Sequence, residues 1–280
     1  MIRNTAKWLE EVYNIELESV PITFPLADEE DFLRAMQKSL ESIDVSRLRF
    51  VVLDHIVSVP AVREPIKELA QLIKSYNKDT FVMVDGAHAM GQVKKLTIGD
   101  LGPIDAYLSN GHKWCYSPKG SAFLWVNQAV TSNVFPEPTV ISSANSIGPT
   151  SFSERYTYVS TRDYTAFLSM SKALEFRENL GGQQAIYEYV NGLAMDAKQY
   201  LIDLWNVTAM APDGMEDYMI NIGLPKGIPD AEVGKALHDW LLDKHNMYML
   251  VLYNKESEVF FTRLSAQVYL DLTDFVSLGE

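Results

Sequence analysis

Hydrophobic and polar positions in the first half of the chain follow two periods, one typical of helices and the other of strands. Apolar residues spaced three and four positions apart predict amphipathic helices over 4–14, 28–42 and 64–76. Short apolar runs between them predict strands, since a strand buried on both faces of a parallel sheet is apolar almost throughout. The predicted strands are ELESVPITF (16–24), RLRFVVLDHI (47–56), TFVMVD (80–85), DAYLS (105–109) and SAFLWV (121–126).

The order of these elements predicts the fold class. A strand, a helix and a strand follow one another between 49 and 85, which is the length expected of a βαβ unit with a right-handed crossover. We therefore expect an α/β fold with a mostly parallel sheet flanked by helices. An irregular stretch rich in proline and serine follows at 129–160, and helical spacing returns over 163–178.

The end of the chain has a different pattern. A long helix is predicted over 183–205, and the elements after it are short strands and two further helices. We expect a large domain over 1–180 and a smaller C-terminal α+β domain over 181–280. The elements predicted after the long helix are the strands YMINIGLP (218–225), YMLVLY (248–253) and VFFTRLS (259–265), a helix over 230–244 and a final helix from Asp271.

Charge and composition exclude several classes of protein. The 280 residues carry a net charge of -13, which argues against a nucleic-acid partner because little positive charge is available to neutralise phosphates. No apolar run approaches the ~18 to 20 residues needed to cross a membrane. The first dozen residues include acidic ones and have no apolar core, so they do not resemble a targeting segment. The single cysteine, Cys115, fits a reducing compartment. We expect an intracellular, cytoplasmic protein.

Polar residues capable of chemistry follow three of the predicted strands. Ligands of open α/β sheets lie at the carboxyl ends of the strands, so these side chains are expected to face one crevice. They are Asp54, His55 and Ser58 after one strand, Asp85 and His88 after the next, and Asn110, His112 and Lys113 after the third.

Lys113 and Asp85 fit the needs of one cofactor, pyridoxal 5'-phosphate. A lysine in an apolar, partly desolvated site has a lowered pKa and can attack a carbonyl. A carboxylate on a neighbouring strand end can keep the pyridine nitrogen protonated, so that the ring acts as an electron sink. The alternative is that Asp85 caps the turn DGAH and that Lys113 is an exposed loop lysine.

Other residues in this region have simpler explanations as well. His55 can serve only to bond backbone, and Ser58 can be a turn residue before Pro60. Trp114 and Tyr116 are more typical of packing than of cofactor contacts. A metal site is possible from ligand type, but it leaves Lys113 unexplained and we expect no metal. Its ligands would come from Asp54, His55, Asp85, His88 and His112.

Several ordered motifs resemble one protein family. VDGAHAMGQ, YLSNGHKW and PKGSAFLWV are similar to the class V aminotransferase superfamily of fold type I pyridoxal-phosphate enzymes. The branch they resemble contains isopenicillin N epimerase and cysteine desulfhydrase-like proteins. VVLDHIVSVPAVREPIKELAQLI, YVSTRDYTAFLSMSKALEF and RLSAQVYLDLTDF extend the resemblance over nearly the whole chain.

The resemblance implies roles for residues around the cofactor. Lys113 would be the lysine that bonds the cofactor aldehyde, and Asp85 would pair with the pyridine nitrogen. His88 and Ser58 would lie near the phenolic oxygen of the ring. His112 and Asn110 would reach toward the phosphate.

Two further residues acquire roles from the resemblance. Thr161 in YVSTRDYTAF corresponds to a threonine that contacts the phosphate of the neighbouring subunit's cofactor, which implies a homodimer with shared active sites. The family usually has glycine before that threonine, whereas this chain has Ser160. Arg263 in FFTRLSAQ corresponds to the arginine that binds the substrate carboxylate, a bidentate role to which arginine is suited.

The resemblance implies a small amino-acid substrate and a reaction at its Cα or Cβ. Cysteine desulfurases of the superfamily use a mobile cysteine a little upstream of the arginine, and residues 240–262 contain none. We therefore expect a cysteine desulfhydrase-like C–S lyase, with epimerisation or amino transfer as alternatives. The first strands and the phosphate-binding turn of the family would lie upstream of Met1, so a truncated, non-catalytic fragment or interaction protein is the alternative of another class.

Overall fold

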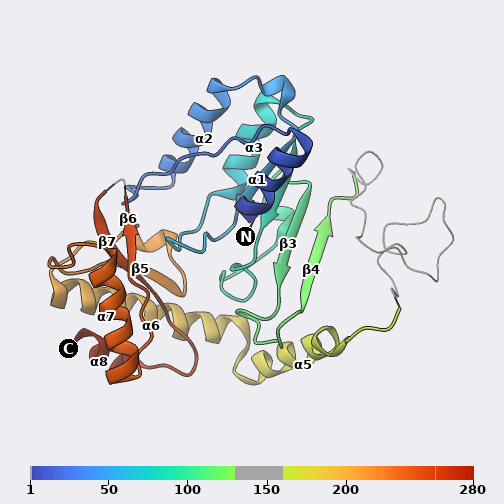
Figure 1. Ribbon diagram of the computed structural model, residues 1–280. Helices are drawn as coiled ribbons and strands as arrows, with labels where there is room; N and C mark the ends of the chain where they lie inside the picture. Colours follow the sequence, from blue (N-terminus) through green and yellow to red (C-terminus); the bar gives the residue numbers. More distant parts are fainter. Residues whose placement is uncertain (1, 130–159, 256) are drawn as a thin grey trace.

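The computed structural model describes residues 2–129, 160–255 and 257–280, and its first sheet has the order β1-β2-β3-β4. Strands β1, β2 and β3 run parallel, and β4 runs antiparallel to β3. The predicted mostly parallel sheet is therefore confirmed (Figure 1). Its strands are β1 (Phe50–Asp54), β2 (Phe81–Asp85), β3 (Ala106–Asn110) and β4 (Ala122–Val126).

One face of this sheet packs against α2 (Glu30–Ser42) and α3 (Ile66–Tyr76). The apolar stripes of the two helices are buried in one cluster with strand residues of alternating positions, because successive strand side chains point to opposite faces. The cluster includes Phe32, Met36, Leu40, Leu69 and Ile73 from the helices and Leu53, Val82, Val84 and Tyr107 from the strands.

The opposite face of the sheet is more open and carries the acidic groups. Phe50 is 51% exposed, although its ring stacks on that of Phe81. The parallel register aligns Asp54 with Asp85 at the carboxyl ends of β1 and β2. The two carboxylates therefore lie side by side on this face.

The second sheet is antiparallel and has the order β5-β7-β6. Every residue of β5 is buried, since the strand packs against the long helix α6 while β7 pairs with one of its edges. Figure 1 shows α6 extending from α5, below β4, toward β5. These elements are α5 (Thr165–Asn179), α6 (Gly182–Trp205), β5 (Met219–Gly223), α7 (Ala231–His245), β6 (Leu252–Asn254), β7 (Val259–Ser265) and α8 (Leu272–Gly279).

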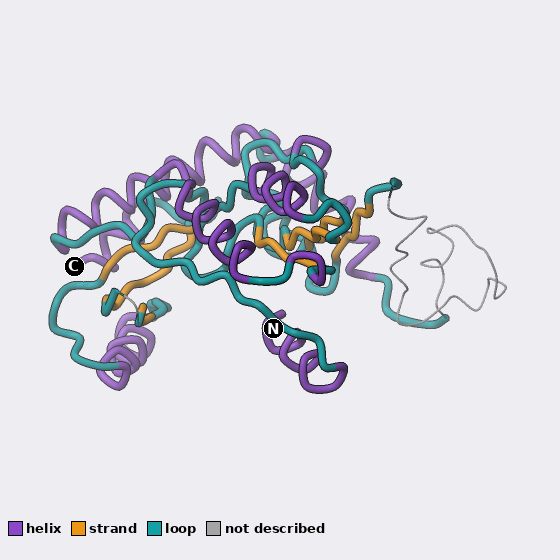
Figure 2. The backbone as a smooth tube through the Cα atoms, turned by 90° about the horizontal axis from the view of Figure 1, so that it is seen from above, coloured by secondary structure: helices purple, strands orange, loops and turns teal. Residues whose placement is uncertain are grey.

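The two sheets share their packing. Met210, Met215 and Phe261, from the second half of the chain, are buried in the cluster under the first sheet. Ile56 and Trp114, which follow strands of the first sheet, are buried in the cluster around β5 and α6. Figure 2 shows the strands of both sheets lying among the helices in the view from above. Contacts of this kind bring loops of the first sheet against β5.

The predicted helices are observed with ends shifted by a few residues, and α1 spans Ile2–Tyr13. The predicted strand over 16–24 is wrong: the segment is irregular and largely exposed. Pro21 has no N–H to donate to a sheet, and no strand of the described residues pairs with the segment. The predicted strand over 248–253 is also shorter than expected, because β6 begins only at Leu252.

Most of the irregular stretch predicted over 129–160 lies outside the described residues. Within the part of the chain that the structure describes, no helix combines the length and the apolar character needed to cross a bilayer.

Candidate active site

The turn after β2 carries two of the predicted site residues, Asp85 and His88. A carboxylate oxygen of Asp85 accepts the backbone N–H of Ala87 at 2.9 Å, so the predicted capping role is observed. The Gly86 N–H donates to the Leu108 carbonyl at 2.7 Å. A side chain at Gly86 would place its Cβ 2.1 Å from the Tyr107 hydroxyl, so this position requires glycine. These contacts hold the turn against the end of β3.

Lys113 and His88 meet across the ends of β3 and β2. The Lys113 Nζ atom lies 3.1 Å from His88 Nε2, although the residues are 25 positions apart. Lys113 is partly buried, which excludes the exposed-lysine alternative. Burial lowers the pKa of its amine, and Arg263 adds to that effect, whereas Asp85 and Asp54 oppose it. Burial, assisted by Lys113 and Arg263, lowers the pKa of His88 to about 4.

The protonation of His88 follows from these contacts. A neutral imidazole has one N–H donor and one acceptor nitrogen. When a protonated Lys113 donates to Nε2, the proton of His88 must reside on Nδ1. This Nδ1 atom is buried and has no partner among the described residues. It is therefore an N–H donor available to an acceptor atom of a ligand.

Asn110 and His112 lie at the end of β3, just before Lys113. The side-chain oxygen of Asn110 is buried without a partner among the described residues. His112 Nδ1 lies 3.3 Å from the Ser121 carbonyl, which also accepts the N–H of Gly111. The two residues adjoin Lys113, and the Asn110 carboxamide can turn to offer its NH2 group.

Arg263 reaches this region from β7 of the second sheet. Its Nη1 atom donates to the backbone carbonyl of Ser58 at 2.8 Å, while its buried Nε has no partner in the described structure. Burial lowers the pKa of Arg263, and its charge acts on both His88 and Lys113. Ser58 thus contributes its carbonyl to this arginine, and its side chain belongs to an exposed residue.

Asp54 lies at the end of β1, and only the metal alternative assigns it a role. Desolvation raises the pKa of its carboxyl group to about 6, with Asp85 adding to the effect and Lys113 opposing it. The buried ring of His55 instead turns away to the Tyr107 hydroxyl, 3.0 Å from Nδ1. The described residues contain no group of three or more acidic, histidine or cysteine side chains that could hold a metal.

Thr161 is exposed, and its position among the site residues stays a prediction. Ser160 before it has a φ of 83°, in the left-handed region that favours glycine. Ser160 therefore adopts a backbone conformation typical of glycine, the residue that the family usually has at this position.

The aromatic and thiol neighbours of Lys113 are packing residues. Trp114 is buried and its ring meets that of Tyr218 edge-on. Cys115 is also buried, and burial raises the pKa of its thiol. Tyr116 packs under the guanidinium of Arg177. Gln92 ends the motif VDGAHAMGQ, four residues after His88, and its side chain is fully buried.

An amine and an imidazole thus meet at the carboxyl edge of a mostly parallel sheet, the usual ligand position of α/β proteins, and the charge of Arg263 acts on both. Residues 13–240 match the family described as Aminotransferase class-V, and the chain belongs to that family.

Curated relatives carry names of lyases. The chain is 29% identical to the L-cysteine desulfhydrase-like protein lolT1 of Epichloe uncinata over 84% of its own length and 61% of the relative. It is 25% identical to the hercynylcysteine sulfoxide lyase of Schizosaccharomyces pombe, over 96% of this chain and 66% of that protein. For the L-cysteine desulfhydrase of Arabidopsis thaliana the identity is 28%, with 88% and 52% covered. The chain thus spans only part of these relatives.

Solved structures share the fold. The cystine C-S lyase C-DES, in complex with its product cysteine persulfide, superposes with a TM-score of 0.76 at 17% identity, covering 99% of this chain and 71% of the other. A NIFS-like protein gives 0.73 at 16%, covering 99% and 69%. A C-DES mutant with glycine covalently linked to its PLP cofactor gives 0.70 at 17%, covering 87% and 62%.

Proposed function

We propose that this chain binds pyridoxal 5'-phosphate through Lys113 and catalyses C–S bond cleavage in a cysteine-like amino acid. The observation that carries the proposal is the partly buried Lys113 amine beside a neutral histidine, next to the carboxylates of Asp85 and Asp54. An amine with a lowered pKa is suited to attack an aldehyde at neutral pH.

The unpaired atoms fit the proposed cofactor. The buried Nδ1–H of His88 can donate to the phenolic oxygen, and the carboxylate of Asp85 can accept the N–H of the pyridine ring. Asn110 and His112, beside Lys113, are assigned to the phosphate. Pyridoxal phosphate bound there would act as an electron sink for the substrate Cα.

The remaining steps belong to the chain's own side chains. Arg263 binds the substrate carboxylate with its free Nε and the guanidinium group beyond it, and Ser58 orients that guanidinium through its carbonyl. With the cofactor and substrate bound, Lys113 would accept the Cα proton at Nζ. A lowered amine pKa favours this role as general base.

Elimination of sulfur from Cβ is the favoured outcome. The lyase names of the relatives from Epichloe uncinata, Schizosaccharomyces pombe and Arabidopsis thaliana support it. Residues 240–262 contain no cysteine to accept sulfur, and Cys115 is buried with a raised pKa. Loss of sulfide by elimination needs no such thiol.

The proposal includes a homodimer. Thr161 is assigned to the phosphate of the partner's cofactor, and its exposed position and the glycine-like backbone at Ser160 support that assignment. Residues 1–180 are assigned to the cofactor-binding domain and residues 181–280, which supply Arg263, to the smaller one.

The cofactor part is tested by adding pyridoxal phosphate to the purified chain. We expect a visible absorption band that borohydride fixes covalently at Lys113, as peptide mapping would show. The Lys113→Ala variant should lose the band completely, because no amine remains beside His88. Lys119→Ala, which removes an exposed lysine of the same loop, is the matched control and should keep it. A wild-type chain without the band would contradict the proposal and favour a non-catalytic fragment.

The reaction is tested separately. Release of sulfide and pyruvate from L-cysteine would support the lyase, whereas loss of optical activity without sulfide would support an epimerase.

A further inference from the structure

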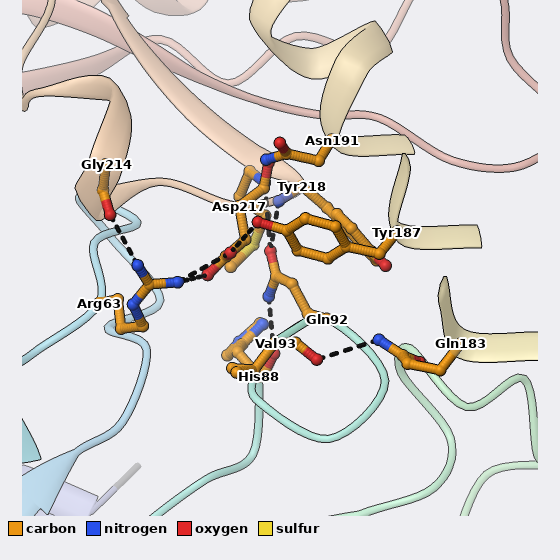
Figure 3. Close-up of polar contacts among 11 residues, drawn as sticks. Arg63, His88, Gln92, Val93, Gln183, Tyr187, Asn191, Gly214, Asp217 and Tyr218 are labelled. Carbon is orange, nitrogen blue, oxygen red and sulfur yellow. Dashed lines mark hydrogen bonds and ion pairs between the residues drawn. The ribbon is translucent and has the colours of Figure 1, made fainter. Parts of the chain in front are cut away.

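Gln92 connects the turn that carries His88 to the second sheet. Its side chain is fully buried, and its Nε2 donates to the backbone carbonyl of His88 at 2.6 Å. Its Oε1 accepts the backbone N–H groups of Tyr218 at 2.9 Å and Met219 at 3.2 Å. Figure 3 shows the carboxamide between the His88 turn and the start of β5. One side chain therefore joins segments 126 positions apart.

This contact occupies a sheet edge. β5 lies at the edge of its sheet: β7 pairs with one side, and residues 208–210 bond the far end of the other side. The first backbone N–H groups of this outer side need other partners. The Oε1 atom of Gln92 accepts the N–H groups at the start of β5, and its NH2 group donates to the His88 carbonyl. Because both ends of the amide are paired inside the protein, displacing it would leave buried polar groups without partners.

Two other links lie beside this contact, and neither reaches His88. Gln183 donates to the carbonyl of Val93 at 3.0 Å, further along the chain. Arg63 and Asp217 form a pair that fixes the segment before β5, with both Nη1–Oδ distances at 2.9 Å. Figure 3 shows these two links on either side of Gln92. Gln92 differs from both, because the same carboxamide that bonds the start of β5 also bonds the backbone carbonyl of His88.

We propose that Gln92 is a positioning residue that holds the His88 imidazole against Lys113 by tying the turn after β2 to β5. The inference rests on the proposed function, because it takes Lys113 and His88 as the site. The charged groups acting on His88 are Lys113, at the end of β3, and Arg263, on β7. A small shift of the turn would break the 3.1 Å contact that selects the His88 tautomer.

The test is the tautomer of His88, measured by 15N NMR of the imidazole at neutral pH in the chain without cofactor. Wild type should show a single form with the proton on Nδ1. In Gln92→Met, which keeps the volume and loses the amide, His88 should lose this single form and show averaged nitrogen shifts. The His55 tautomer should stay unchanged as an internal reference, because its ring is held by Tyr107.

Gln183→Met is the matched control, since it removes an amide on α6 that bonds the same segment at Val93 without contacting His88. It should lower the thermal midpoint and leave the His88 tautomer as in wild type. A folded Gln92→Met with the wild-type tautomer would overturn the inference.

A second measurement on the wild type applies if Gln92→Met does not fold. The side-chain amide protons of Gln92 should exchange with solvent far more slowly than those of the exposed Gln199; equal rates would also overturn the inference. Neither measurement uses pyridoxal phosphate or turnover. Failure here is therefore distinct from the absence of the Lys113 absorption band.

Discussion

Two buried polar regions meet at β5, and they differ in how well their atoms are paired. In the first, Glu216 accepts from Lys198 at 2.6 Å with one oxygen and from the Asn221 backbone at 2.8 Å with the other. The Asn221 side chain in turn exchanges two hydrogen bonds with the backbone of Ala61. In the second, around Lys113, several buried side-chain atoms have no partner among the described residues. They include His88 Nδ1, Asn110 Oδ1, Trp114 Nε1 and Arg263 Nε.

The difference in pairing distinguishes buried polar groups that stabilise the fold from those that remain available to a ligand. A buried polar group costs about 1–3 kcal/mol when it is unpaired, so fully paired groups stabilise the fold and unpaired ones destabilise it. The paired region joins the loop after β1 to β5 through Ala61 and Asn221. The unpaired region keeps its donors and acceptors for a ligand. Substitutions in the paired region should therefore cost more stability than substitutions in the unpaired region.

The largest effect is expected from Lys198→Met in the paired region. The substitution leaves the Glu216 carboxylate buried without its cation, and loss of one partner of a buried ion pair costs about 3–5 kcal/mol. Urea unfolding monitored by circular dichroism measures the change in the free energy of unfolding. Lys235→Met removes an exposed pair with Asp239 and should change it by less than about 1 kcal/mol. Equal costs for the two variants would contradict the comparison.

An intermediate effect is expected from the pH dependence of His55. Burial lowers its folded pKa to about 4, below the ordinary 6.5, so the unfolded chain binds the proton more tightly between these values. The part of the free energy of unfolding that depends on neutral His55 is fully present above about pH 6.5 and is lost as the pH falls toward about 4. On acidification from about pH 7 to pH 4.5, His55→Gln should therefore lose about 2 kcal/mol less stability than wild type.

Urea unfolding at the two pH values measures this loss in wild type and variant. His88→Gln is the comparison from the unpaired region; burial also lowers the folded pKa of His88 to about 4, so this variant should lose a similar part of the pH dependence. A variant that loses as much stability on acidification as wild type would show that His55 is not responsible.

The smallest effect on stability is expected from Arg263→Met. Its guanidinium is partly buried with one unpaired nitrogen, and the only hydrogen bond described for it goes to the Ser58 carbonyl. The free energy of unfolding should change by less than about 1 kcal/mol, since an apolar replacement removes a desolvation cost. Under the proposed function the KM for L-cysteine should rise markedly. A large loss of stability would place Arg263 in the paired region instead.

Local sequence predicted much of the fold and part of the site. The apolar stripe of α2 and the run around β1 are periodic signals that do not depend on distant residues, and both predictions are confirmed. The segment 16–24 has the same kind of pattern and is irregular. A strand needs a neighbour to satisfy its backbone, and no local pattern reveals whether one is present.

The sequence by itself determined that Asp85, His88, Asn110 and Lys113 follow neighbouring strands, because strand periodicity and the carboxyl-edge rule act over a few residues. Only the tertiary structure decided that Lys113 meets His88 at 3.1 Å and that Gln92 ties their turn to β5. It also brought Arg263 to Ser58 across 205 positions. Such pairs depend on how two sheets pack, and packing is set by the whole buried surface rather than by any one segment.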